Sequence, residues 1–263
     1  MTNRKLVLNE KKLKVLKVKD RTDKMTISVN RLFDLPMRLL LFGKSGHGKS
    51  NLLVGLLLNK NYGYDKIFDG SRIFLFAPSP YADEKLKIII EEKDIPDANV
   101  FDEYSDELLL EVYEMLVEDF KDRAEEGEPL KMSLIVLDDL SFSGKLAGRF
   151  NALAKVYCNS RKYLISVICL SQAYTQIAKN IRSQASGMII FNTSNRELKS
   201  IEEENNYLKG GKSAFFDMFR NNVLTKFDFL CINYSNDYKE LYLNSEFKNI
   251  LELETNKTET EDK

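Results

Sequence analysis

The chain has 263 residues, of which 43% are hydrophobic and 30% are charged, and its formal net charge at pH 7 is −1. This composition is typical of a globular protein with one large or two small domains. Because 16 Phe and 12 Tyr can supply a core, extensive disorder is excluded. A chain with almost no net charge is not a polycation that coats nucleic acid, so any DNA binding must use a local basic patch.

Cysteine usage and the length of the apolar runs restrict the compartment. The three cysteines, Cys158, Cys169 and Cys231, are odd in number and form no C-x-x-C pair. We therefore expect a reducing compartment rather than a disulfide framework. Residues 164–170 form the longest core run, which is far shorter than the roughly 18–20 residues of a membrane-spanning helix. We expect no transmembrane segment.

The two ends of the chain differ in charge from its middle. The first 24 residues carry nine Lys or Arg and three Asp or Glu, and Lys alternates with apolar residues between Lys12 and Val18. For residues 1–30 this pattern predicts either an edge strand with a charged outer face or a basic arm. Residues 251–263 are acidic and polar and predict a flexible tail. Residues 31–250 are expected to form the main domain.

Short apolar segments alternate with helical patterns along this domain. Strands are expected at residues 37–42, 73–76, 134–137, 165–170 and 188–191. Helices are expected at residues 50–58, at residues 106–123 with Asp106 as the cap, and around residues 146–157. Continuous apolar strands joined by helices are typical of a mostly parallel sheet covered on both faces. Residues 227–232 and 240–243 predict a C-terminal β-hairpin.

Residues 43–50 carry the most specific motif in the chain. They read G-K-S-G-H-G-K-S and fit G-x-x-x-x-G-K-[ST], a phosphate-binding loop that follows a strand and opens a helix. Glycines let the main chain approach a polyphosphate, which backbone N–H groups and the helix N-terminus then bind. We expect Lys49 to reach the β- and γ-phosphates of ATP and Ser50 to hold Mg²⁺. The expected nucleotide-binding set is Gly43, Lys44, Ser45, Gly46, His47, Gly48, Lys49, Ser50 and Asn51.

Two carboxylates follow the third predicted strand. Asp138 and Asp139 come directly after residues 134–137, and the carboxyl ends of parallel strands face the ligand crevice. We expect Asp138 to hold Mg²⁺ through its hydration shell, as a Walker-B acid does. Asp139 is expected to orient or deprotonate the attacking water.

Polar residues flank the fourth predicted strand on both sides. Gln172 follows it, where an amide contacts both the γ-phosphate and water and senses hydrolysis. Arg161 precedes the strand, at the end away from the chain's own nucleotide. It is interpreted either as an arginine finger for a neighbouring subunit or as an ordinary surface residue. Arg149 and Arg182 are the competing fingers.

A second motif imitates a guanine-reading site. Residues 225–228 read T-K-F-D and fit the T/N-K-x-D pattern of GTPases. The D-x-x-G motif that GTPases carry after the third strand is missing, since the sequence there is D-D-L-S-F. We therefore interpret Lys226 and Asp228 as solvated faces of a hairpin strand.

Taken together, G-K-S-G-H-G-K-S, L-I-V-L-D-D-L, N-S-R-K-Y-L-I-S-V-I-C-L-S-Q and I-R-S-Q-A-S-G-M-I-I-F resemble the FtsK–HerA superfamily. Within it, the chain is most similar to the viral genome-packaging ATPases of the poxvirus and virophage type. The resemblance spans about residues 36–205 and implies a three-layer α/β P-loop NTPase fold, RecA/ASCE-like, with strand order 5-1-4-3-2. It also implies Arg161 as the finger and Gln172 as the sensor. Lys162 departs from the many relatives that carry His there.

The resemblance further implies ATP and Mg²⁺ as cofactors and double-stranded DNA as substrate. It implies a homo-oligomeric ring, a pentamer or hexamer, that works with capsid or portal-vertex proteins in the host cytoplasm or a viral factory, with association with the virion as an alternative. DNA at the ring axis is expected to contact basic residues, for which the candidates are Lys145, Arg149, Lys209 and Lys212.

Three alternative functions remain open. The nearest is a DNA pump or helicase of the same superfamily from a plasmid or a cell. A P-loop small-molecule kinase is the second, although no Arg-rich lid is recognisable. A nucleotide-gated assembly factor without turnover is the third.

Overall fold

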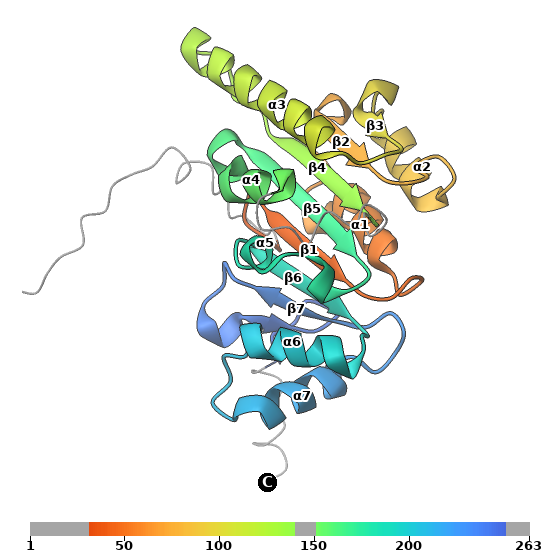
Figure 1. Cartoon of the computed structure of the whole chain (residues 1–263), viewed down its shortest axis with the longest axis vertical. Coiled ribbons are helices and arrows are strands. Elements are labelled where there is room, and N and C mark those ends of the chain that lie inside the picture. The colour runs from red at the N-terminus through yellow and green to blue at the C-terminus, as the bar shows by residue number, and fades with distance from the viewer. Residues whose placement is uncertain (1–31, 140–150, 251–263) are drawn as a thin grey trace, which may run out of the picture.

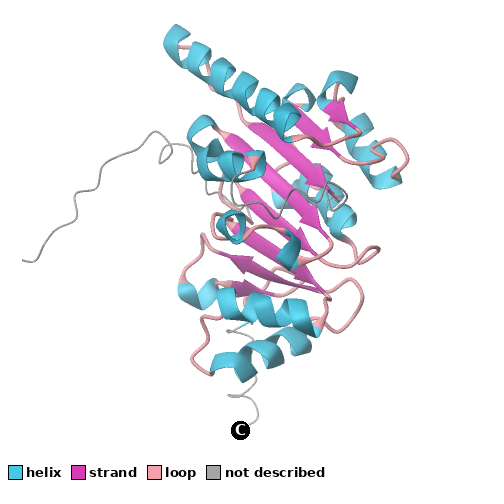
Figure 2. Cartoon of the chain, viewed as in Figure 1, coloured by secondary structure: helices cyan, strands magenta, loops and turns pink. Residues whose placement is uncertain are grey.

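A computed structural model describes residues 32–139 and 151–250 of the chain. The predicted N-terminal arm, residues 1–30, and the predicted tail, residues 251–263, lie outside the described residues. An eight-stranded sheet forms the centre of the described part (Figures 1 and 2). Its strands are β1 (Arg38–Phe42), β2 (Ile73–Phe76), β3 (Val100–Phe101), β4 (Ser133–Asp138), β5 (Ile165–Ser171), β6 (Gly187–Phe191), β7 (Phe229–Asn233) and β8 (Tyr242–Leu243).

The order of the strands in space is β3-β2-β4-β5-β1-β6-β7-β8. The five predicted strands correspond to β1, β2, β4, β5 and β6, so they lie in the expected order 5-1-4-3-2 and pair in parallel. The sheet is wider than expected, because the short strand β3 extends one edge. At the other edge β7 pairs antiparallel with β6, and β8 pairs antiparallel with β7.

Helices cover both faces of the sheet. One face packs against α3 (Asp106–Glu126), α4 (Ala152–Asn159), α5 (Lys179–Arg182), α6 (Asn195–Asn205) and α7 (Gly211–Asn222). The other face packs against α1 (Lys49–Leu58) and α2 (Glu84–Glu92). Alternation along β1 shows why both faces need cover: Leu40 enters the first core, whereas Leu39 and Leu41 enter the second. The predicted three-layer α/β architecture is confirmed.

Two local expectations differ from the structure. Ser105, rather than Asp106, caps α3, since its hydroxyl accepts a hydrogen bond from the Leu108 N–H at 3.0 Å. Asp106 is already helical, and its carboxylate accepts from the Tyr104 hydroxyl at 2.8 Å. The helix predicted around residues 146–157 is described only from Ala152 onward, because residues 140–150 lie outside the described part.

The predicted C-terminal hairpin is present, with a different start. The first strand, β7, begins at Phe229 rather than at residue 227. Lys226 and Asp228 therefore lie in the loop between α7 and β7, and the expectation that they occupy strand faces was wrong. Because β7 is antiparallel to β6, with Phe229 opposite Phe191, this loop lies at the edge of the sheet where β6 ends.

Two further findings concern the cysteines and the helices of the described residues. Cys158, Cys169 and Cys231 are all free, with the latter two buried. Of the helices in the described ranges, none combines the length and apolar character that crossing a membrane requires.

A partly buried ion pair joins α5 to α6. The Arg182 guanidinium, 8% exposed as a residue, donates to Glu204 from Nη2 at 2.6 Å and from Nε at 3.1 Å. The Tyr174 hydroxyl donates to the same carboxylate at 2.7 Å, and the guanidinium lies 4.2 Å from the centre of the Tyr174 ring. Burial alone raises the pKa of Glu204, but the hydrogen bonds from Arg182 and Tyr174 outweigh it and lower the pKa. These contacts hold the Arg182 guanidinium in place between α5 and α6.

We expect Arg182→Ala to lower the free energy of unfolding by about 3 kcal/mol, because it leaves a partly buried carboxylate without its partner. Since the pKa of Glu204 is lowered in the folded protein, this loss shrinks as the pH falls through that pKa. Urea denaturation at several pH values measures it. Lys179→Ala is the matched control: its amine lies 3.9 Å from the same carboxylate but is 76% exposed, so we expect almost no change. Equal effects of the two variants would contradict the assignment.

Candidate nucleotide-binding site

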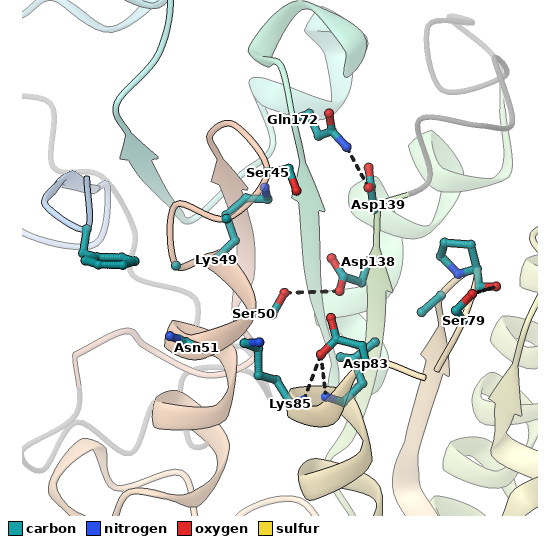
Figure 3. Close-up of a pocket in the computed structure, with 16 residues that line it drawn as sticks. Ser45, Lys49, Ser50, Asn51, Ser79, Asp83, Lys85, Asp138, Asp139 and Gln172 are labelled. Atoms are coloured by element: carbon teal, nitrogen blue, oxygen red, sulfur yellow. Dashed lines mark hydrogen bonds between the residues drawn. The ribbon is translucent and has the colours of Figure 1, made fainter. Parts of the chain in front are cut away.

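A cavity of about 500 Å³ opens at the carboxyl ends of β1, β4 and β5 (Figure 3). Its wall combines the glycine-rich loop after β1, the ends of β4 and β5, and the segment between β2 and α2. Residues of this wall are Ser45, Gly46, Gly48, Lys49, Ser50, Asn51, Ala77, Pro78, Ser79, Asp83, Lys85, Leu86, Asp138, Asp139, Gln172 and Phe227. Most of the predicted loop residues and the three predicted polar residues of β4 and β5 therefore meet in one place.

Two glycines are required by the shape of the loop. A Cβ atom at Gly43 would lie 2.6 Å from the Cβ of Phe191 on the neighbouring strand β6, so only glycine fits there. Gly48 has a φ of +104° at the N-cap of α1, a conformation that other residues rarely adopt. The loop between them is consequently free to fold tightly around an anion.

The N-terminus of α1 lacks a side-chain cap. Helices α2, α3, α4 and α6 are capped by Asp83, Ser105, Asn151 and Ser194, whereas the N-cap of α1 is Gly48, which has no side chain, and the first turn of α1 has no acidic residue. The first N–H groups of a helix have no partner within it and carry a partial positive charge. At α1 these N–H groups remain available to a ligand, and a phosphate supplies the hydrogen-bond acceptors and the negative charge that they favour.

Lys49 is a buried cation on the floor of this cavity. Its residue is 8% exposed, and its Nζ donates to the carbonyl oxygens of Gly43 at 2.7 Å and Lys44 at 3.3 Å. Burial lowers the pKa of Lys49, although the charges of Asp138 and Asp139 act in the opposite direction. A cation held mainly by neutral carbonyls is well placed to pair with a phosphate.

Ser50 and Asp138 offer a pair of oxygen ligands. The Ser50 hydroxyl lies 3.5 Å from Asp138 Oδ2, and Asp138 is 7% exposed. Burial raises the pKa of Asp138 to about 6; Lys49 opposes this shift, whereas the charge of Asp139 adds to it. Hydroxyl and carboxylate oxygens are donors that Mg²⁺ prefers, and Mg²⁺ commonly takes its remaining ligands from phosphates and water. These residues fit a magnesium ion bound together with a nucleotide.

Asp139 and Gln172 join the ends of β4 and β5. The Gln172 amide Nε2 donates to Asp139 Oδ2 at 2.7 Å (Figure 3). Asp139 has a φ of +47°, a left-handed conformation that turns the chain sharply after β4. A carboxylate and an amide thus lie next to each other at the edge of the cavity.

Neither Arg161 nor Arg182 lines this cavity. Arg161 is exposed in the short helix Ser160–Tyr163, at the amino end of β5, whereas Gln172 follows its carboxyl end. The seven residues of β5, at about 3.3 Å each, place roughly 20 Å between the two ends. Arg182 is bound to Glu204, and Arg149 and Lys145 lie outside the described residues. Lys209 and Lys212 are exposed around the start of α7.

Asp83 and Phe227 line the cavity and were not predicted as site residues. Asp83 caps α2 through hydrogen bonds from the N–H groups of Lys85 at 2.8 Å and Leu86 at 3.4 Å, and its charge helps to raise the pKa of Asp138. An Asp before an amphipathic run is a recognisable helix start, but nothing in the sequence indicates that α2 lies beside the phosphate-binding loop. Phe227 belongs to the T-K-F-D motif at residues 225–228, which could have drawn attention to it, but this motif was predicted to lie on a strand.

The charge on Asp138 predicts a measurable dependence of stability on pH. Its pKa is raised to about 6 in the folded protein, so it favours folding below its unfolded pKa, and this contribution is lost as the pH rises through about 6. Without nucleotide and magnesium, the unfolding free energy of wild type should fall by about 2 kcal/mol relative to that of Asp138→Asn between about pH 4 and about pH 7.5. Urea denaturation measures both proteins. Parallel pH profiles would show that Asp138 is not buried as described.

Several solved structures share this fold at low sequence identity. The genome packaging NTPase B204 from Sulfolobus turreted icosahedral virus 2, in complex with ATP-gammaS, is 16% identical, with a TM-score of 0.51 over 76% of this chain and 93% of that chain. The pCW3 conjugation coupling protein TcpA is 14% identical, with a TM-score of 0.52 over 77% of this chain and 58% of that chain. EssC from Geobacillus thermodenitrificans is 17% identical, with a TM-score of 0.50 over 66% and 35%.

These likenesses confirm the fold. No curated protein sequence matches the chain. The family described as Poxvirus A32 protein matches residues 24–254, which include every strand and helix of the described part and the whole cavity wall. The chain therefore belongs to the Poxvirus A32 protein family, in agreement with its resemblance to the poxvirus-type branch of genome-packaging ATPases.

Proposed function

We propose that this chain is the ATP-hydrolysing motor that moves double-stranded DNA into a viral capsid. The observation that carries the proposal is the single cavity in which an uncapped helix N-terminus, a buried lysine, a serine–aspartate pair and an aspartate–glutamine pair meet. Membership of the Poxvirus A32 protein family and the fold shared with the B204 packaging NTPase support the same conclusion.

Different residues along the cavity bind the phosphates and the magnesium ion. The N–H groups of residues 44–51 bind the phosphates of ATP, and Lys49 exchanges its carbonyl partners for the β- and γ-phosphates. Ser50 and Asp138 would hold Mg²⁺, which would supply positive charge close to the phosphate oxygens. Because Asp138 is buried and its pKa is raised, a nearby cation favours its ionised form.

Asp139 and Gln172 act on the water. The Asp139 carboxylate orients the attacking water and accepts its proton, while the Gln172 amide holds the water and contacts the γ-phosphate. The Gln172 amide donates a hydrogen bond to the Asp139 carboxylate at 2.7 Å. Positioning of this kind accounts for most of the acceleration in phosphoryl transfer.

A motor function is favoured over the alternatives by the family and by the fold. A small-molecule kinase needs an acceptor site beside the γ-phosphate, whereas here that position is taken by Asp139 and Gln172, which suit a water molecule. A DNA pump or helicase of plasmid or cellular origin uses the same fold, and the likeness to TcpA keeps it as the second candidate. Stimulation of hydrolysis by duplex DNA without strand displacement distinguishes the motor from the helicase.

The active form of the motor is a homo-oligomeric ring, a pentamer or hexamer, that engages capsid or portal-vertex proteins in the host cytoplasm or a viral factory. Arg161 lies at the opposite end of β5 from the cavity, so it is suited to a neighbouring subunit's nucleotide and not to its own. DNA in the ring meets basic side chains, for which exposed Lys209 and Lys212 are candidates among the described residues.

We expect Asp139→Asn to reduce ATP hydrolysis by at least about 100-fold while ATP still binds, because the variant loses the proton acceptor and keeps the phosphate-binding loop. Lys49→Ala should abolish hydrolysis and weaken binding as well. Steady-state hydrolysis and equilibrium binding of a non-hydrolysable ATP analogue measure the two effects. Asp102→Asn, at an exposed position away from the cavity, is the control and should behave as wild type. Normal turnover in both site variants would refute the assigned site.

Mixing variants tests the role of Arg161. Alone, Arg161→Ala and Asp139→Asn should both be inactive, whereas an equimolar mixture should recover part of the DNA-stimulated hydrolysis. In the mixture an intact cavity from one variant faces an intact arginine from the other. Lys162→Ala, at the next exposed position, should remain active alone. An Arg161→Ala protein that hydrolyses ATP normally would identify Arg161 as a surface residue.

A further inference from the structure

An exposed aromatic ring lies at the cavity. Phe227 is 58% exposed and lines the same cavity as Lys49 and Ser50. A single exposed phenylalanine is ordinary on a protein surface. Here two further observations, its contact with the phosphate-binding loop and the turn that fixes it, point to a ligand.

Phe227 and Lys226 lie directly against the glycine-rich loop. A Cβ placed on Gly48 would lie 3.4 Å from Cδ1 of Phe227, and one placed on Gly46 would lie 3.5 Å from Nζ of Lys226. The Lys226 Nζ is also 5.5 Å from the centre of the Phe227 ring. The two side chains therefore border the position at which a bound nucleotide leaves the loop.

A turn built by Asp228 fixes this segment. Its Oδ2 accepts hydrogen bonds from the N–H groups of Thr225 at 2.7 Å and Leu224 at 3.2 Å, and its Oδ1 accepts from the Ser245 hydroxyl at 3.4 Å. The N–H of Phe227 donates to the Thr225 hydroxyl at 3.4 Å. Both carboxylate oxygens are thus used within the protein, and the guanine-reading role that T-K-x-D has in GTPases does not apply to Asp228.

The sheet order decides which end of a nucleotide faces this turn. On one side of β1 lie β5 and β4, which end at Gln172, Asp138 and Asp139. On the other side lie β6 and β7, and the turn precedes β7 (Figure 1). If the γ-phosphate faces the carboxylates, the base must extend toward β6 and β7, where Phe227 lies.

We propose that Phe227 is the stacking surface for the nucleotide base and that the Asp228 turn positions it; this inference rests on the proposed function. Every nucleobase has a π-face, so stacking on phenylalanine fixes the position of the base without reading its identity. Phe227 consequently contributes equally to binding of ATP and GTP. Lys226, beside the ring and the loop, adds positive charge near the phosphates.

The test compares nucleotide with inorganic tripolyphosphate. Phe227→Ala should weaken binding of ATP and GTP by about 5- to 150-fold, the equivalent of the stacking measured for bases on aromatic side chains, and leave binding of tripolyphosphate unchanged. Isothermal titration with each of the three compounds measures it. Phe227→Tyr should keep wild-type affinity. Leu224→Ala is the matched control, because Leu224 is 75% exposed in the same turn and does not line the cavity.

The outcomes are separable from those of the proposed function. Wild type that binds no ATP would refute the nucleotide site itself. Wild-type binding of ATP by Phe227→Ala would overturn the stacking role alone, as would an equal loss of ATP and tripolyphosphate, which indicates a damaged loop. Asp228→Ala should weaken ATP and GTP alike, and a selective loss of GTP would overturn its assignment to the turn.

Discussion

Burial of two opposite charges around an uncapped helix end is the constraint on which this structure depends. Lys49 and Asp138 are almost completely buried, yet Lys49 donates to carbonyl oxygens and Asp138 has only a long contact with Ser50. Burial lowers the pKa of the lysine and raises that of the carboxyl, so neither charge is fully stabilised by the protein. In the proposed function, a polyphosphate would supply an anion to the lysine and to the N–H groups of α1, and its magnesium would supply a cation to the aspartate.

The topology of the sheet brings these groups together and makes the two sides of the phosphate-binding loop different. Strand β1 lies between β5 and β6, and the loop that follows it is bordered by polar strand ends on one side and by an aromatic turn on the other. The residues proposed to react therefore lie toward β4 and β5, and the proposed base-stacking surface lies toward β7. The antiparallel direction of β7 is essential, because it brings the turn before this strand to the same edge as the phosphate-binding loop.

Much of the fold and of the phosphate end of the site could be predicted from the sequence, because their signals are local. The loop at residues 43–50 and the two carboxylates after residues 134–137 can each be recognised from a few consecutive residues. Capping of α3 could not be decided, because Ser105 and Asp106 are both good caps and only backbone geometry separates them. Asp228 was misplaced because its partners, Leu224, Thr225 and Ser245, become visible only when the chain folds. Contacts between residues of different elements, such as Asp83 beside Asp138, cannot be recognised from any pattern in the sequence.

The hydrogen bond between Asp139 and Gln172 links the two residues proposed to act on the attacking water. The Gln172 amide donates to Asp139 Oδ2 at 2.7 Å, so in the proposed mechanism a water molecule bound by this carboxylate would compete with the amide for it. Gln172 follows β5, and Arg161 precedes the same strand, roughly 20 Å away by strand length. A fully buried strand thus separates the residue proposed to contact the chain's own nucleotide from the residue proposed for a neighbouring subunit's nucleotide. Because an arginine side chain cannot span that distance, the finger role proposed for Arg161 requires a second subunit.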